Sequence, residues 1–475
     1  MAGNGWRMLM ECLSAGRAIS LPSTANGGGQ AASLTSGAYA RVRRQFGQSI
    51  SKFEGIEEPL ARIGGFTYII DAALSMAAAA IDNGAKPSVV GAILKYHTTE
   101  KGWQIALDAM DIHGGKGICL GPNNYLGRSF QGVPIAITVE GANILTRSLI
   151  IFGQGAIRCH PYVFKEMESV RKNDLVQFDK AFFAHAGFFL ANLTKSILFM
   201  FTDGYFSSAP ESLVRRYYQL VHKYSANLAF LADFSMTLLG GDLKRMEKLS
   251  GRLGDMLSSL YLLSAVLKRF HTDGEPKDDL PLVVWSCQQL LHECELAMDG
   301  VIVNFPQRWA RVFLGLVLKP FGSLRHKPSD YLGHKVARIL STPNETRTRL
   351  TRLVYKKPAE NCPIGRLEEA FLKICRIEEL EKKFIYLVKK NQLKSLTAIE
   401  QIDEALNAGL LSPSEAEQLR EAEYARQDVI RVDDFADDEL RRPSVKEFET
   451  KKLDEKHLDK TLYIVQAEGK SGTID

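Results

Sequence analysis

The chain has 475 residues, of which 45% are hydrophobic and 24% charged, as in a globular protein with a sizeable core. The formal net charge is only +5, and Lys and Arg are scattered, so we expect no dedicated nucleic-acid-binding face. The seven cysteines include no CxxC pair, which indicates a reducing compartment and no zinc site; Cys287, His292 and Cys294 read as one face of an apolar helix. The first residues carry no signal-peptide pattern, so we expect a cytoplasmic location.

Helical spacing dominates the chain and strand-like alternation is scarce, which predicts an all-α fold. The Ala-rich stretch Leu60–Ile81 is opened by Glu57-Glu58-Pro59, whose acids and first-turn proline favour a helix N-terminus. Between Val89 and Met110, apolar residues recur three, four and seven positions apart, as on one face of a helix. A further apolar helix is expected over Ile144–Ile151.

The segment Ala181–Phe201 is the best membrane candidate. Its length fits a membrane span, but five polar residues, His185 and Lys195 among them, interrupt it. We therefore favour a helix that is buried between domains. The alternative is a surface that enters a membrane, which would give the protein a peripheral position at the inner membrane.

Beyond residue 161 the helical patterns continue to about residue 433. They lie at about 181–202, 212–240, 243–270 and 282–300, followed by a basic loop at 319–330 and an amphipathic helix over 367–387. Thr397 with Glu400 and Ser412 with Glu415 match the capping box, which predicts a helical hairpin over 397–427. The tail 434–475 is charged and poor in apolar residues, so we expect it to be partly disordered or to wrap the surface.

Three motifs point to chemistry. Glu140 follows the apolar run Val133–Val139 and precedes a glycine, so burial of that run would desolvate its carboxylate and make it a better base. Tyr39–Gly47 sets cations beside an aromatic residue, and Asp111–Gly117 is a Gly-rich turn after a helical pattern.

In this order the three motifs resemble the C-terminal helical domain of the acyl-CoA dehydrogenase family, in particular the large bacterial fatty-acyl-CoA dehydrogenases of β-oxidation. The resemblance implies a four-helix bundle over 1–160, a helical C-terminal extension over 161–433 and the tail 434–475. Residues 3–13 resemble the linker that leaves the family's β-domain, and 14–17 the start of the first bundle helix. We therefore expect the N-terminal helical and middle β domains to be missing.

The resemblance also predicts one long helix from Arg17 to Arg44. This conflicts with local propensity, since each residue of Gly27-Gly28-Gly29 costs about 1 kcal/mol relative to Ala in a helix. We follow the family pattern, in which such glycines allow close helix packing.

The implied reaction is FAD-dependent dehydrogenation of a fatty acyl-CoA to trans-2-enoyl-CoA. Glu140 would remove the α-proton, its backbone N–H and a flavin ribityl hydroxyl would bind the thioester oxygen, and FAD would take the β-hydride. The family passes its electrons to an electron-transfer flavoprotein. Arg17 matches the substrate-side arginine near the start of the bundle.

The resemblance assigns the remaining site residues to FAD. Arg43 matches the arginine that binds the flavin pyrophosphate of a neighbouring subunit, which implies a homo-oligomer. Gln45 and Phe46 would line the adenine end, and no metal is implied.

The Gly-rich turn matches the family's contact with the adenosine diphosphate part of FAD. Gly114 and Gly115 would let the backbone approach it, with Asp111 where many relatives have Gln or Glu. Asn143 is the residue that could replace a flavin-binding hydroxyl carried by many relatives. On this interpretation Glu140 should lie near Arg43 and the two glycines.

Three alternatives stay open at this point. The chain could be a non-catalytic helical interaction protein that retains the motifs. It could be half of a split enzyme, completed by another chain that supplies the missing domains. It could also be an acyl-CoA oxidase, which uses oxygen as the electron acceptor.

Overall fold

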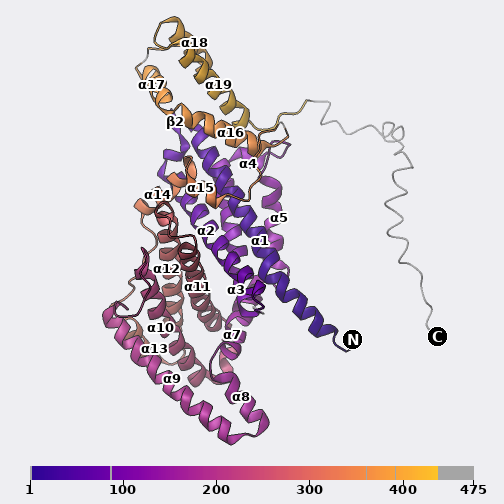
Figure 1. The fold of residues 1–475 in the computed structure, drawn as a ribbon, viewed down its shortest axis with the longest axis vertical. Helices are drawn as coiled ribbons and strands as arrows, with labels where there is room; N and C mark the ends of the chain where they lie inside the picture. Colours follow the sequence, from indigo (N-terminus) through magenta and orange to yellow (C-terminus); the bar gives the residue numbers. More distant parts are fainter. Residues whose placement is uncertain (1–2, 86–87, 360, 391, 437–475) are drawn as a thin grey trace, which may run out of the picture. The chain divides into compact units, whose positions relative to one another are not determined.

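The computed structural model describes residues 3–85, 88–359, 361–390 and 392–436, and it is helical almost throughout (Figure 1). The first part contains α1 (Gly5–Val42), α2 (Glu54–Asp82), α3 (Ser88–His113), α4 (Gly115–Ile118), α5 (Gly127–Thr138), α6 (Asn143–Leu145), a π-helix (Thr146–Ile151) and α7 (Phe152–Arg158). The strands β1 (Arg44–Gln45) and β2 (Gln48–Ser49) form a small antiparallel hairpin, and a 3-10 turn (Ile50–Lys52) follows it. The predicted all-α class is confirmed.

The extension contributes the later helices. They are α8 (Val163–Lys172), α9 (Leu175–Thr202), α10 (Arg215–Leu239), α11 (Glu247–Thr272), α12 (Leu280–Val303), α13 (Arg308–Leu318), α14 (Asp330–Ser341), α15 (Glu345–Leu350), α16 (Pro363–Arg376), α17 (Glu378–Lys389), α18 (Ala398–Asn407) and α19 (Pro413–Ile430). Two further 3-10 turns cover Gly240–Lys244 and Lys277–Asp279. Residues 437–475, and with them the prediction for the tail, lie outside the described residues.

Helix α2 is the element around which both parts pack. It contacts α1 and α3 on one side and α11, α12 and α14 on the other, within one continuous apolar core. Small residues let these helices approach closely: a Cβ on Gly65 would stand 1.9 Å from the ring of Trp285, and one on Gly64 would stand 3.0 Å from Val336. Residues 1–432 therefore form one compact unit, and the boundary proposed at residue 160 stays a prediction.

Helix α1 runs through Gly27-Gly28-Gly29 without a break, as the family pattern predicted. It starts at Gly5, however, so the predicted linker over residues 3–13 is wrong. No strong helix breaker follows Gly5 in this stretch, and the backbone N–H of Met8 already donates to the carbonyl of Asn4.

Other helix boundaries in the structure also differ from the predicted ones. The α2 helix begins at Glu54, so Pro59 lies in its second turn rather than its first. The helix expected over Ile144–Ile151 is α6 followed by a π-helix, and the helix expected over 367–387 is interrupted at Ile377. The hairpin over 397–427 is confirmed, with both capping boxes formed.

The interpretation of Ala181–Phe201 as a buried helix is wrong. Helix α9 is long and apolar enough to cross a membrane by length and composition, yet only 11% of its most apolar window is buried. Helix α2 passes the same test with 67% buried, and the bent pair formed by α5 and residues 143–151 would count as a third candidate. Periodicity could not distinguish these cases, because an apolar helix looks the same in sequence whether protein or another medium covers it.

Glycine substitutions in α1 and α2 should have opposite effects on stability. We expect Gly65→Ala to lower the free energy of unfolding by about 1–3 kcal/mol, since its Cβ would overlap the Trp285 ring. Gly27→Ala is the matched control: it is exposed, with nothing within 4 Å of its Cβ position, and should raise stability by about 0.5–1 kcal/mol. Urea unfolding followed by circular dichroism measures both; equal effects of the two changes would contradict the packing described here.

Candidate functional site

Glu140 lies in a tight turn between α5 and α6. Its φ is 56° and that of Gly141 is 98°, so both residues adopt the left-handed conformation that non-glycine residues rarely occupy. The turn directs the carboxylate toward α1: Oε1 lies 3.7 Å from the place that a Cβ on Gly16 would take. Oε2 is buried and has no hydrogen-bond partner within the described part of the chain. An unsatisfied buried carboxylate oxygen of this kind is typical of a group that meets a ligand.

Lys95 of α3 holds this turn in place. Its side chain is fully buried, and its amine donates hydrogen bonds to the carbonyls of Gly141 (2.7 Å) and Ile137 (3.3 Å) and to Oδ1 of Asn143 (2.5 Å). Burial lowers the pKa of Lys95 to about 8, helped by the positive charge of Arg17 and opposed by Glu140. The amine therefore fixes the position of the turn that carries the carboxylate.

Asn143 completes this connection between the turn and α3. While Oδ1 accepts from Lys95, Nδ2 donates to Oγ1 of Thr99 (2.9 Å) and to Oε1 of Glu100 (2.7 Å), and the side chain is buried. The structure thus engages Asn143 in positioning the turn. Its predicted contact with the flavin stays a prediction.

Arg17 lies beside the Glu140 turn, and its predicted role on the substrate side stays a prediction. Its Nη2 is 3.6 Å from the place that a Cβ on Gly141 would take, and its Nε is buried without a partner among the described residues. The first turns of α1 and the turn after α5 therefore place a guanidinium and a carboxylate together, each with an unpartnered buried atom.

Sequence reasoning missed Lys95, Thr99 and Glu100. The available signal was the polar run from Lys95 to Lys101, which interrupts the middle of an otherwise apolar helix. All seven residues of that run are buried or partly buried, which is costly for charged groups unless they have partners.

The second group of predicted residues lies at the other end of α1. The hairpin turns at Phe46 (φ 50°) and Gly47 (φ 74°), which leaves Gln45 exposed and Phe46 94% exposed. Arg43 caps α1 beside the phenol of Tyr39, whose pKa is raised by burial against the lowering effect of the Arg43 charge. An aromatic side chain exposed to this degree next to an arginine is available to a flat ligand.

The ring of Tyr39 joins this hairpin to the Gly-rich turn. It stacks on His113 with 4.3 Å between centroids, and its hydroxyl lies 3.5 Å from the His113 carbonyl. Gly114 has a φ of 54°, and no atom lies within 4 Å of the Cβ positions of Gly114 and Gly115. The neighbouring Asp111 is exposed. The two predicted cofactor motifs are thus brought together with their backbone open on one side.

The expectation that Glu140 lies near Arg43 and the glycines within one chain is wrong. Arg17, which lies beside Glu140, precedes Arg43 by 26 residues of α1 and its cap, a distance of about 39 Å at the rise of an α-helix. An uninterrupted helix cannot bring its two ends together. The predicted base and the predicted pyrophosphate site therefore belong to two separate locations.

A cavity of about 470 Å³ lies between α1, α3 and α5. Its walls are mostly apolar or small residues, including Gly28, Gly29, Ala106 and Phe130. Thr99 lines it and also accepts from Asn143, so a hydrogen bond connects the cavity wall to the residue that follows the Glu140 turn. A groove of this composition suits a hydrocarbon chain better than a polar substrate.

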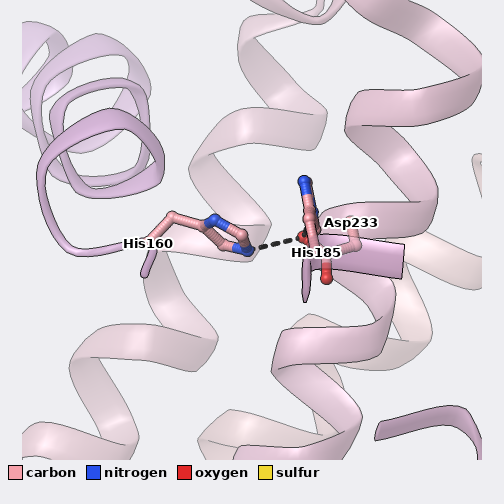
Figure 2. Close-up of side chains that lie close together, drawn as sticks. All are labelled: His160, His185 and Asp233. Carbon is pink, nitrogen blue, oxygen red and sulfur yellow. Dashed lines mark ion pairs between the residues drawn. The ribbon is translucent and has the colours of Figure 1, made fainter. Parts of the chain in front are cut away.

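His160, His185 and Asp233 form a further cluster that the sequence did not reveal (Figure 2). Oδ1 of Asp233, which is buried, lies 2.9 Å from Nε2 of His160 and 3.4 Å from Nε2 of His185. Nδ1 of His160 faces the backbone N–H groups of Tyr162 (3.3 Å) and Val163 (3.1 Å), so the ring proton belongs on Nε2. A metal would need that nitrogen as a lone pair, so the geometry favours a neutral His160 ring whose Nε2–H lies beside the Asp233 carboxylate.

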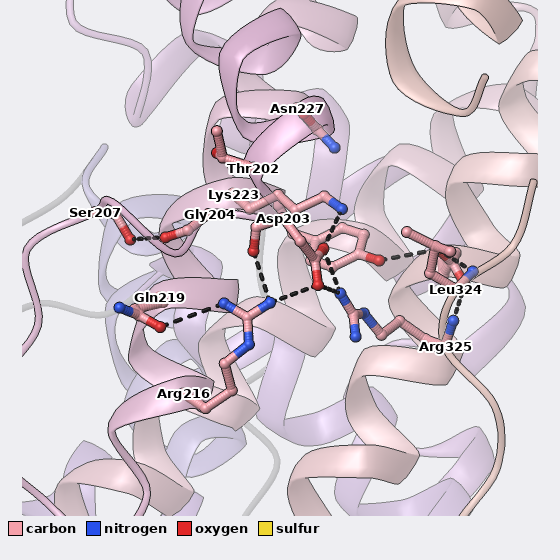
Figure 3. A network of polar contacts seen from close by, with 12 residues as sticks. Thr202, Asp203, Gly204, Ser207, Arg216, Gln219, Lys223, Asn227, Leu324 and Arg325 are labelled. Atoms are coloured by element: carbon pink, nitrogen blue, oxygen red, sulfur yellow. Dashed lines mark hydrogen bonds and ion pairs between the residues drawn. The ribbon is translucent and has the colours of Figure 1, made fainter. Parts of the chain in front are cut away.

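Asp203, just after α9, is the centre of a polar network (Figure 3). It accepts from Arg216 (2.5 Å), Lys223 (2.7 Å) and Arg325 (2.5 Å). These partners keep the pKa of Asp203 low despite the opposing effect of burial. The network joins the end of α9 to α10 and to the loop that follows α13.

Two family models match the chain. The model described as acyl-CoA dehydrogenase, C-terminal domain, matches residues 3–152, and the model described as acyl-CoA dehydrogenase, C-terminal, bacterial type, matches residues 157–435.

Similar proteins include the mitochondrial very long-chain specific acyl-CoA dehydrogenase of Mus musculus, 29% identical over 149 residues that make up 31% of this chain and 22% of that protein. The 3-(aryl)acrylate reductase of Clostridium sporogenes is 31% identical over 146 residues, which are 31% of this chain and 38% of the reductase. The fold resembles an acyl-CoA dehydrogenase from Bacillus anthracis solved with FAD, with a TM-score of 0.53, 18% identity, and coverage of 71% of this chain and 57% of that one. The chain thus spans well under half the length of these two curated relatives.

Replacing Lys95 by methionine should destabilise the protein and release the Glu140 turn. Oδ1 of Asn143 would lose its donor and the carbonyl of Gly141 would keep only the hydroxyl of Thr146, at a cost of about 1–3 kcal/mol for a buried group left unsatisfied. Unfolding by urea measures the cost, and Lys335→Met is a control, because its amine lies over the ring of Tyr331 on α14, outside this turn.

The wild type and the Lys95→Met variant should also differ in how their stability depends on pH. The pKa of Lys95 is about 8 in the folded chain and higher in the unfolded chain, so the unfolded chain binds more protons between pH 8 and about 10.4. The stability of the wild type relative to Lys95→Met should therefore rise with pH across this window. A constant or falling difference would contradict the assignment.

Proposed function

Because this chain belongs to the acyl-CoA dehydrogenase family, we propose that it carries the base and part of the cofactor site for FAD-dependent α,β-dehydrogenation of fatty acyl-CoA to trans-2-enoyl-CoA. The observation that carries the proposal is the Glu140 turn. It holds a buried carboxylate oxygen without a partner among the described residues, Arg17 lies beside it, and Asn143 just after it donates to Thr99 in the wall of an apolar cavity. The matched stretch covers 22% of the mouse dehydrogenase and 38% of the clostridial reductase, so activity, substrate and partners of the whole protein are part of the proposal.

Glu140 would act as the general base. The α-proton of a thioester is only weakly acidic, so its removal needs a carboxylate held against it. The rigid turn provides this, since Lys95 and Asn143 fix the backbone on both sides of Gly141 without bonding to the carboxylate itself. Because Oε2 has no protein donor among the described residues, binding of an acyl chain would not have to break a hydrogen bond within that part of the chain.

The residues present fit FAD at the end of α1 where the hairpin meets the Gly-rich turn. At the hairpin, Arg43 supplies a cation for the pyrophosphate, exposed Phe46 and Gln45 offer a surface to the adenine, and the open backbone of Gly114 and Gly115 allows close approach. When bound, FAD supplies the hydride acceptor. Solved relatives with this fold are complexed with FAD, which supports the assignment.

We further propose a homo-oligomer. The length of α1 separates Glu140 from Arg43 by more than an extended dinucleotide covers, so a single FAD would meet the base of one chain and the arginine of a second copy. Electrons would leave through an electron-transfer flavoprotein. An oxidase would instead produce peroxide without an added carrier protein, and that measurement separates the two.

A second candidate is a chain that works only together with another. The observation that favours it is coverage: the chain matches 22% of the mouse dehydrogenase and 38% of the clostridial reductase. A partner would then supply the remaining domains, or the chain would serve as a non-catalytic helical interaction protein. Co-purification of a second chain together with flavin favours the split enzyme, and a protein that stays colourless in the presence of FAD and any such partner favours the interaction protein.

Glu140→Gln tests the base. In the assembled, FAD-containing protein we expect kcat to fall by about 10²- to 10⁴-fold, because the amide cannot accept the α-proton. The visible flavin spectrum should be unchanged, since the amide keeps the size of the side chain. Glu58→Gln is the control, with a mostly exposed carboxylate on α2. Near-normal turnover by Glu140→Gln would show that another group is the base.

Arg43→Gln tests the cofactor site. Loss of a charged hydrogen-bond donor is worth about 1.5–3 kcal/mol, so FAD affinity should fall by about tenfold to a hundredfold. Titration of apoprotein with FAD, followed by its visible absorbance, measures this. Arg128→Gln replaces an exposed arginine on α5, away from the hairpin, and should bind FAD like the wild type.

A further inference from the structure

Helix α9 exposes apolar side chains and buries polar ones, the opposite of an ordinary surface helix. Its fully buried residues are Ala181, Asn192, Ser196 and Met200, and the Asn192 and Ser196 side chains have buried polar atoms without a partner among the described residues. Its outward face carries large apolar side chains, Leu175, Val176, Phe182, Phe183, Leu190, Ile197, Leu198 and Phe201, which are 38–82% exposed. In water the opposite orientation would be favoured, so this face is built for a non-aqueous medium.

The neighbouring α13 extends this apolar face. Trp309, Val312 and Leu316 repeat at helical spacing and are 57–64% exposed, while Leu314 and Leu318 face the core. The two helices pack on each other (Figure 1), and the ring of Phe321, after α13, contacts Phe201 of α9. The Asp203 network fixes the loop that carries Phe321 against the end of α9 (Figure 3).

The charges beside the α13 part of this face have one sign, whereas Asp174 and Asp179 are exposed at the start of α9. Residues 301–329 contain five Lys and Arg and no Asp or Glu. Lys319 and Arg325 pair with Asp299 and Asp203, but Arg308 and Arg311 are exposed at the start of α13 next to Trp309. Between Lys180 and Asp203, Lys195 is the one charged residue of α9, and it is exposed as well. Arginine and tryptophan beside an apolar face form the composition that suits the headgroup region of an anionic bilayer.

We propose that the outward face of α9 and α13 docks this protein on an anionic lipid bilayer, with α9 lying in the plane of the interface. A spanning orientation is disfavoured because the inner face of α9 packs on α10 and α13 and carries His185, Asn192 and Ser196. A second copy is a poorer occupant, since a symmetric contact would bring the exposed Arg308 and Arg311 of both copies into one interface. The proposal does not depend on the catalytic one.

Co-flotation with vesicles tests the proposal. We expect the chain to float with vesicles of phosphatidylglycerol and phosphatidylcholine, and to bind phosphatidylcholine alone more weakly. Arg308→Gln combined with Arg311→Gln should weaken binding to the anionic vesicles about thirtyfold. Each arginine near an anionic surface contributes about 1 kcal/mol, and about 1.4 kcal/mol corresponds to a tenfold change in affinity.

The apolar face has its own matched variants. Phe183→Ser, Leu190→Ser and Leu198→Ser combined should weaken vesicle binding by more than about a hundredfold, because each side chain leaves hydrocarbon. The control is Leu353→Ser with Leu396→Ser, two exposed leucines outside α9 and α13, which should float like the wild type. Circular dichroism should show the same helix content in all variants, since every altered side chain is exposed.

Fluorescence locates the contact. Vesicles should shift tryptophan emission to shorter wavelength, and Trp309→Phe should remove the shift while Trp103→Phe retains it. Vesicle binding that is insensitive to the α9 and α13 variants would overturn the proposal. So would the absence of binding together with a concentration-dependent dimer that the serine variants abolish, which would make this face an interface between copies.

Discussion

The buried amine of Lys95 is the interaction on which the candidate site depends. A cation at this position would be costly alone, but it meets the carbonyls of the turn after α5 and the amide of Asn143. These contacts hold Glu140 in a left-handed conformation that a glutamate would not adopt without support. One carboxylate oxygen has no protein donor among the described residues while the backbone around it is held by hydrogen bonds, an arrangement that suits the general base proposed above.

Helix α1 contributes to the candidate site and also separates its two parts. Because α1 is uninterrupted, the Arg17 end and the Arg43 end are separated by its full length, and each end gathers its own partners. Glu140 and the apolar cavity lie toward the first, while the hairpin and the Gly-rich turn lie at the second. On the proposed function, a dinucleotide cofactor that needs both ends would make assembly of copies part of the chemistry.

The extension packs into the same apolar core as the first part of the chain and does not form a separate domain. Helices α11, α12 and α14 pack on α2 through Gly64 and Gly65, so the site helices are supported from behind by the second half of the chain. Its far side, formed by α9 and α13, presents apolar side chains and arginines instead of the usual polar surface. The extension thus supports the helices of the candidate site and, on the proposal above, offers a surface to a lipid bilayer.

The sequence alone determined the helical class, the 397–427 hairpin and the family, because these depend on periodicity, caps and short motifs that are local in the chain. The family resemblance also predicted that α1 runs through Gly27-Gly28-Gly29, against local propensity. Only the tertiary structure decided which predicted residues meet. Arg17 meets Glu140 across the bundle and Arg43 does not, Lys95 became visible only through its partners, and the outward face of α9 could not be told from a buried one. Contacts between distant segments set these outcomes, and hydrophobic spacing carries no information about what lies opposite.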